Sequence, residues 1–133
     1  MEEALVAGVV SDVSERMKES PNYTQVALGN FVQEQPSLSQ FLSAKMRDVG
    51  EGEGVVHTVF HAEVLAECFR RHLGCKSLPP VSFDTLNTVA TGSLAERAEA
   101  ALPALFGYIQ SNVDDERMRG ALYLVALAFH HGG

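Results

Sequence analysis

The sequence has only two cysteines, few aromatic residues and no long apolar segment among its 133 residues. The longest apolar run, ALYLVALAF (121–129), is far shorter than the ~20 residues needed to span a bilayer, so we expect no membrane-spanning helix. Two cysteines do not resemble a disulfide framework. If Cys68 and Cys75 share a helix, their Cα atoms are about 10 Å apart at 1.5 Å per residue. A disulfide allows less than ~7 Å, which predicts reduced thiols in a cytoplasmic protein.

Basic residues are also scarce. Ten lysines and arginines are scattered among seventeen acidic residues, which gives a formal net charge of −7. Nucleic-acid binding requires clustered cations that displace phosphate counterions, and anionic membrane surfaces impose a similar requirement. We therefore expect no binding to nucleic acid or to membranes. A negative surface suits a basic protein partner.

Catalytic motifs are absent as well. The sequence contains no HExxH of metalloproteases, no CxxC and no nucleophile elbow of the form GxSxG. The segment ATGSLAE (90–96) resembles a glycine turn before a helix, but it lacks the lysine and the spacing of a P-loop. We expect a protein that is not an enzyme, although an active site without a known motif stays open.

The apolar residues recur at helical spacing along nearly the whole chain, and no segment alternates with the period of a half-buried strand. An apolar fraction of 46% is enough for a core. The sequence predicts an all-α fold, a compact bundle of six or seven short helices in one domain (1–133). The helices are expected to pack largely orthogonally, because short connections join them.

Several helix boundaries follow from capping residues and prolines. Ser37, Ser82 and Ser93 are predicted to begin helices, because a serine hydroxyl can accept a hydrogen bond from a first-turn amide. Pro103 interrupts a helical segment and predicts a kink or two short helices. The segment GEGEG (50–54) is predicted to be a flexible acidic loop.

The C-terminal helix is predicted to be apolar on nearly all sides. Tyr123, Leu124 and Leu127 lie off its main apolar stripe, and a helix that is apolar all round is buried all round. It is either the central helix of the domain, which we favour, or half of a dimer interface. The stripe itself contains Met118, Ala121, Leu122, Val125 and Phe129.

The segment HTVFHAEVLAECFRRHLGC (57–75) holds three of the five histidines and both cysteines. At 100° per residue its apolar residues form one core face. The charged side chains lie opposite and are expected to face water, and the histidines and cysteines form a narrow stripe between the two faces. The charged set is Glu63, Glu67, Arg70 and Arg71, and the stripe is His57, His61, Cys68, His72 and Cys75.

This stripe raises the possibility of a metal site. His57 and His61 are four residues apart and can chelate one transition metal such as zinc, and Cys68 and His72 form a weaker pair. His61 and Cys68 are about 10 Å apart along the axis, so one ion cannot bind the whole stripe. A haem requires only one histidine and also stays open. We favour a simpler interpretation without a cofactor, in which these residues border the core.

Val56 and Phe60 lie outside the core face of the same helix. Together with Tyr123, Leu124 and Leu127, they indicate apolar surface that can bind a partner. The leading hypothesis is therefore a non-enzymatic protein-interaction or regulatory module that binds another protein or self-associates as a homodimer. The alternative is a metal- or haem-binding helical protein that uses the pair His57 and His61.

Overall fold

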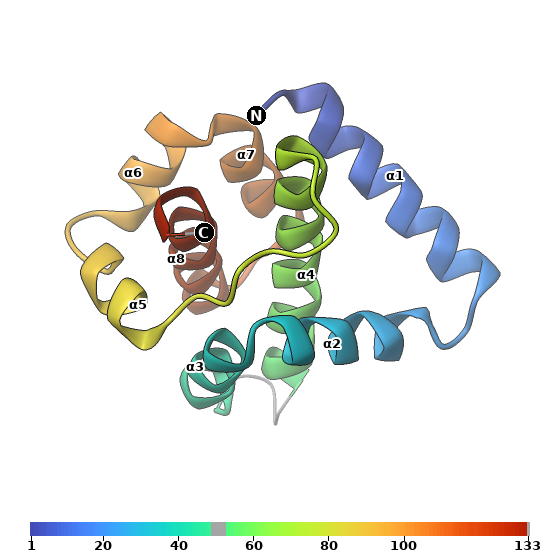
Figure 1. Cartoon of the computed structure of the whole chain (residues 1–133), viewed down its shortest axis with the longest axis horizontal. Coiled ribbons are helices and arrows are strands. Elements are labelled where there is room, and N and C mark those ends of the chain that lie inside the picture. Colours follow the sequence, from blue (N-terminus) through green and yellow to red (C-terminus); the bar gives the residue numbers. More distant parts are fainter. Residues whose placement is uncertain (49–52, 133) are drawn as a thin grey trace.

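The computed structural model describes residues 1–48 and 53–132. The described residues form helices and no strands (Figure 1), so the predicted all-α class is confirmed. The helix count was predicted too low, since the same residues contain eight helices. They are α1 (Glu3–Glu19), α2 (Tyr23–Glu34), α3 (Pro36–Met46), α4 (Glu53–Leu73), α5 (Phe83–Val89), α6 (Leu94–Ala101), α7 (Pro103–Asn112) and α8 (Glu116–Gly132).

Local sequence signals explain most of the boundaries. The hydroxyls of Ser82 and Ser93 accept hydrogen bonds from the backbone amides three residues later, at 3.1 and 3.3 Å, as predicted for caps. Pro103 divides its segment into α6 and α7, and Leu102 between them leaves the helical region with φ −138° and ψ 62°. The predicted start at Ser37 is wrong: Pro36 is the first residue of α3, where a missing N–H costs nothing.

Two helices in mutual contact, α4 and α8, lie at the centre of the molecule. Helices α1, α2 and α3 pack against α4, and helices α5, α6 and α7 pack against α8. Figure 1 shows α8 nearly end-on, whereas α4 runs across the view and α2 lies across α4. The buried apolar side chains form one continuous cluster that includes residues of both central helices.

The C-terminal helix α8 is less uniformly apolar than predicted. Its first turns carry Glu116, Arg117 and Arg119, and its last turn carries His130 and His131. Its middle, residues 122–129, is buried throughout, because α3, α4, α5, α6 and α7 all contact the helix.

A buried glutamine joins the first half of the fold to the connector between α4 and α5. Gln35, between α2 and α3, is fully buried. Its amide nitrogen donates to the carbonyl of Pro79 at 3.0 Å, and its amide oxygen accepts from the backbone N–H of Val81 at 2.8 Å. The side chain thus pairs with two backbone groups of the connector, one of which, the N–H of Val81, is buried and requires a partner.

Most of the predicted acidic loop GEGEG lies outside the described residues, and α4 begins within its last part, at Glu53. At its C-terminal end, α4 is followed by Gly74, whose φ of +70° is the left-handed conformation that glycine adopts without strain. The N–H of Cys75 donates to the carbonyl of Arg70 at 2.9 Å, as in a Schellman cap. None of the described helices combines the length and the apolar character needed to cross a bilayer.

Candidate functional site

Two adjoining depressions lie where α1, α2 and α4 meet. The first, here called the polar cavity, has a volume of about 240 Å³ and is lined mainly by charged and polar side chains of these three helices. The second, here called the apolar groove, has a volume of about 270 Å³. Phe60 lines both. The groove is lined by Met17, Thr24, Val56, His57, Phe60 and His61.

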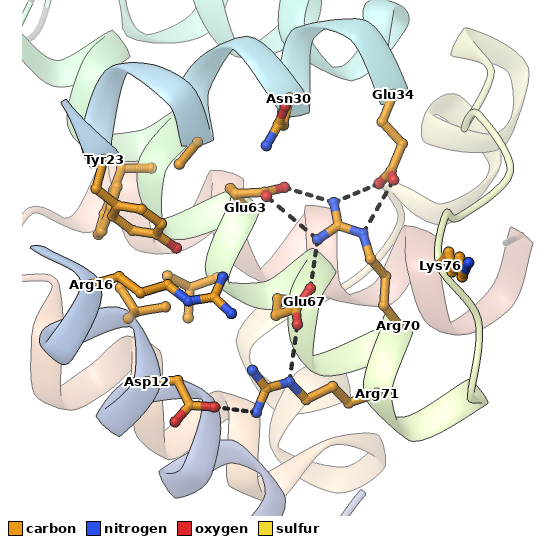
Figure 2. A pocket seen from close by; sticks show the side chains of 14 residues that line it. Asp12, Arg16, Tyr23, Asn30, Glu34, Glu63, Glu67, Arg70, Arg71 and Lys76 are labelled. Carbon is orange, nitrogen blue, oxygen red and sulfur yellow. Dashed lines mark hydrogen bonds and ion pairs between the residues drawn. The ribbon is translucent and has the colours of Figure 1, made fainter. Parts of the chain in front are cut away.

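A single arginine at the base of the polar cavity pairs with three carboxylates (Figure 2). Its side chain is 10% exposed, and those of Glu34 and Glu63 are 12% and 13% exposed. Arg70 donates through Nε and Nη2 to the two oxygens of Glu34, at 3.1 and 2.8 Å. Nη2 also donates to Glu63 at 2.8 Å, and Nη1 donates to Glu67 at 2.9 Å. The guanidinium therefore joins α2 to α4 with charge-assisted hydrogen bonds.

A second, more exposed arginine continues the network towards α1. Arg71 donates to Glu67 at 2.9 Å through Nε and pairs with Asp12 of α1 at 2.7 Å. Glu67 thus receives hydrogen bonds from both arginines. Burial raises its pKa, but these two arginines outweigh that effect, so the pKa of Glu67 lies below its usual value.

Glu63 differs from Glu67 in its ionisation. Burial raises the pKa of Glu63, and the hydrogen bond and charge of Arg70 only partly oppose the shift. The neighbouring carboxylates of Glu34 and Glu67 raise it further. At the base of the cavity, the positive charge of Arg70 therefore does not fully offset the effect of burial on Glu63. Carboxylates with such a raised pKa are often found at functional sites.

The apolar groove contains both predicted metal-binding histidines, in different environments. His57 is exposed, whereas His61 is partly buried and its Nδ1 lies 2.8 Å from the hydroxyl of Tyr108 on α7. Burial, with a smaller contribution from the charge of His57, lowers the pKa of His61. Burial also raises the pKa of Tyr108, so the neutral forms of both groups are favoured.

The structure separates the other two predicted ligands from this pair. Cys68 is fully buried in the core, and burial raises the pKa of its thiol to about 12. His72 is exposed near the end of α4. No group of three or more histidine, cysteine or acidic side chains is arranged to hold a metal within residues 1–48 and 53–132. Metal binding by His57 and His61 stays a prediction.

The predicted partner-binding residues divide between the surface and the core. Val56 and Phe60 line the apolar groove, where Val56 is 44% exposed. The side chains of Tyr123, Leu124 and Leu127 are instead buried in the chain's own core, at 4% exposure or less. Because neighbouring helices pack around the middle of α8, these three residues contribute little to the surface of the folded chain, and their role in partner binding stays a prediction.

Sequence reasoning missed the polar cavity and the contribution of α1 to the groove. The charged residues of α4 were assigned to solvent, yet Glu63 and Arg70 are largely covered, and α2 supplies Glu34 as a partner of Arg70. One signal was available: Glu63, Glu67 and Arg70 recur at spacings of four and three, which places them on one helix face. The exposed Met17 of α1 lines the groove, but no local pattern relates it to Val56.

Comparisons with protein-family models, with curated protein sequences and with solved structures found no match to this chain.

Proposed function

We propose that this chain is a non-enzymatic interaction module that binds a helical segment of a partner protein in the apolar groove. The observation that carries the proposal is the exposure of two large apolar side chains beside Phe60. Met17 is 47% exposed and Val56 is 44% exposed, and they approach one groove from two different helices. An amphipathic helix that inserts one or two apolar side chains is the usual occupant of such a groove.

The energy available from the groove is moderate. Full burial of one valine or methionine side chain contributes about 1.5–3 kcal/mol, and about half of each side chain is still exposed to water. Met17 and Val56 together would then contribute about 1.5–3 kcal/mol. Micromolar affinity requires about 8 kcal/mol, so the partner must also contact the borders of the groove.

The charge of the chain indicates the kind of partner. A formal net charge of −7 attracts a basic segment and repels an acidic one. The proposed occupant is therefore an amphipathic helix with apolar residues on one face and lysine or arginine residues beside them. The lack of catalytic motifs in the sequence is consistent with a binding role.

Selection from a displayed peptide library on the immobilised protein would test the proposal. Selected peptides are expected to combine apolar and basic residues, and V56E should weaken their binding about tenfold or more. V32E is the matched control, because Val32 is 50% exposed on α2 and lies outside the groove. Equal effects of V56E and V32E would refute the assignment of the groove.

Sedimentation equilibrium of the same variants would distinguish a second copy of the chain from a different partner. If the wild-type protein dimerises and V56E alone makes it monomeric, the occupant is another copy. If all three proteins are monomers and the peptides bind, the occupant is a heterologous helix.

A further inference from the structure

The charges that line the polar cavity are arranged with an anionic base and a cationic rim. At the base, Arg70 faces Glu34, Glu63 and Glu67, all at 30% side-chain exposure or less. This buried set has one positive and three negative charges. The exposed charged residues that line the cavity are Asp12, Arg16, Arg71 and Lys76, so positive charge predominates where the cavity meets solvent.

Two of the cations at the rim, Arg16 and Lys76, take no part in the ion network of the described residues. In the part of the chain covered by the structure, the ion pairs of this region involve Arg70 and Arg71 only. Arg16 reaches from α1 towards the cavity (Figure 2), and it has no ion-pair partner among residues 1–48 and 53–132. Its guanidinium keeps a rigid set of donors that matches a carboxylate.

The base of the cavity can still accept hydrogen bonds. The five N–H donors of Arg70 are shared among three carboxylates that together offer about twelve lone-pair sites. Within the described part of the chain, Arg70 is the donor to Glu63, at 2.8 and 3.4 Å. Its pKa is raised by burial and by its acidic neighbours, so a further positive charge beside Glu63 would be stabilised.

We propose that the polar cavity binds a small zwitterion of the amino-acid class, with its ammonium group directed to Glu63 and its carboxylate directed to Arg16. A simple anion would meet the carboxylates of the base, and a simple cation would leave Arg16 without a partner. The hydroxyl of Tyr23 and the amide of Asn30 also line the cavity and offer neutral hydrogen-bonding groups. A volume of about 240 Å³ lies below the ~300 Å³ at which pockets for drug-sized ligands begin.

Isothermal titration calorimetry with three matched probes tests this proposal on the full chain. The zwitterion 6-aminohexanoate carries both charges, hexanoate lacks the ammonium group, and 1-aminopentane lacks the carboxylate. The zwitterion is expected to bind at least about tenfold more tightly than either probe with a single charge. L-lysine is tested as a second amino-acid ligand. The proposal is overturned if neither 6-aminohexanoate nor L-lysine shows saturable binding, or if the three matched probes bind equally.

Two variants assign the charges. R16Q and E63Q should each weaken binding of 6-aminohexanoate about tenfold or more, whereas R47Q and E99Q, at exposed positions outside the cavity, should not change it. If E63Q does not fold, R16Q decides, because Arg16 takes no part in the network; an effect equal to that of R47Q would refute the site. V56E should leave zwitterion binding unchanged, which separates this proposal from the proposed function.

Discussion

Replacing Arg70 with methionine tests whether the buried ion network contributes to stability. The substitution keeps most of the side-chain volume but removes the guanidinium shared by three carboxylates, whose side chains are 12%, 13% and 30% exposed. Removing one partner of a buried ion pair costs about 3–5 kcal/mol. Since domains of this kind unfold at a cost of about 5–15 kcal/mol, R70M should be severely destabilised.

Urea denaturation followed by circular dichroism measures this loss. With a urea dependence of about 2 kcal/mol per molar, a loss of about 4 kcal/mol lowers the midpoint by about 2 M. R71M is the matched control, because Arg71 and its partner Asp12 are 34% and 53% exposed. Exposed pairs contribute about 0–1 kcal/mol, so R71M should lower the midpoint by less than about 0.5 M.

The loss in R70M should depend on pH. Burial already raises the pKa of Glu63, and without Arg70 the charge that opposes this shift is lost, so the pKa of Glu63 in the folded state rises further above the usual ~4.3. Groups with a raised pKa stabilise the folded state at low pH, and this contribution is lost as the pH increases through the raised pKa. The difference between R70M and the wild type should therefore shrink between pH 7 and about pH 4.5.

Two outcomes would refute this reasoning. One is an R70M protein whose stability lies within about 1 kcal/mol of R71M, which would mean that the network is solvated. The other is a difference that does not change with pH. If R70M does not fold at all, R70K and R71K provide the comparison, because lysine keeps the charge but not the planar set of donors.

Three further predictions concern single residues. Gln35→Leu should destabilise the fold by about 1–3 kcal/mol in urea, because it leaves the buried N–H of Val81 without its partner and removes the hydrogen bond to the carbonyl of Pro79; a loss below about 1 kcal/mol would show that the connector rearranges. His61 has a lowered pKa in the folded state, so its contribution to stability is present above the unfolded value of about 6.5 and is lost as the pH falls. The melting temperature should accordingly fall less between pH 7.5 and 5 in His61→Phe than in the wild type, and equal slopes would contradict the assignment. Ser93→Ala should lower the free energy of unfolding by about 1 kcal/mol, because α6 loses its cap. Thermal melting measures this loss, and an unchanged melting temperature would show that water replaces the cap.

The sequence by itself determined the elements whose causes are local. The all-α class follows from helical spacing, and the starts of α5 and α6 follow from the hydroxyls of Ser82 and Ser93, which bond to amides three residues later. The break between α6 and α7 follows from the missing N–H of Pro103. Each of these signals acts within one helical turn, so no knowledge of neighbouring helices is needed.

Only the tertiary structure decided which faces are covered. A helical wheel placed Arg70 in water, but α2 packs over that face of α4 and pairs it with Glu34. The same wheel left Val56 without a neighbour, and the groove exists because α1 brings Met17 beside it. The middle of α8 is buried because helices from both halves of the sequence pack around it. Helical periodicity specifies which residues share a face, whereas burial depends on segments distant in sequence.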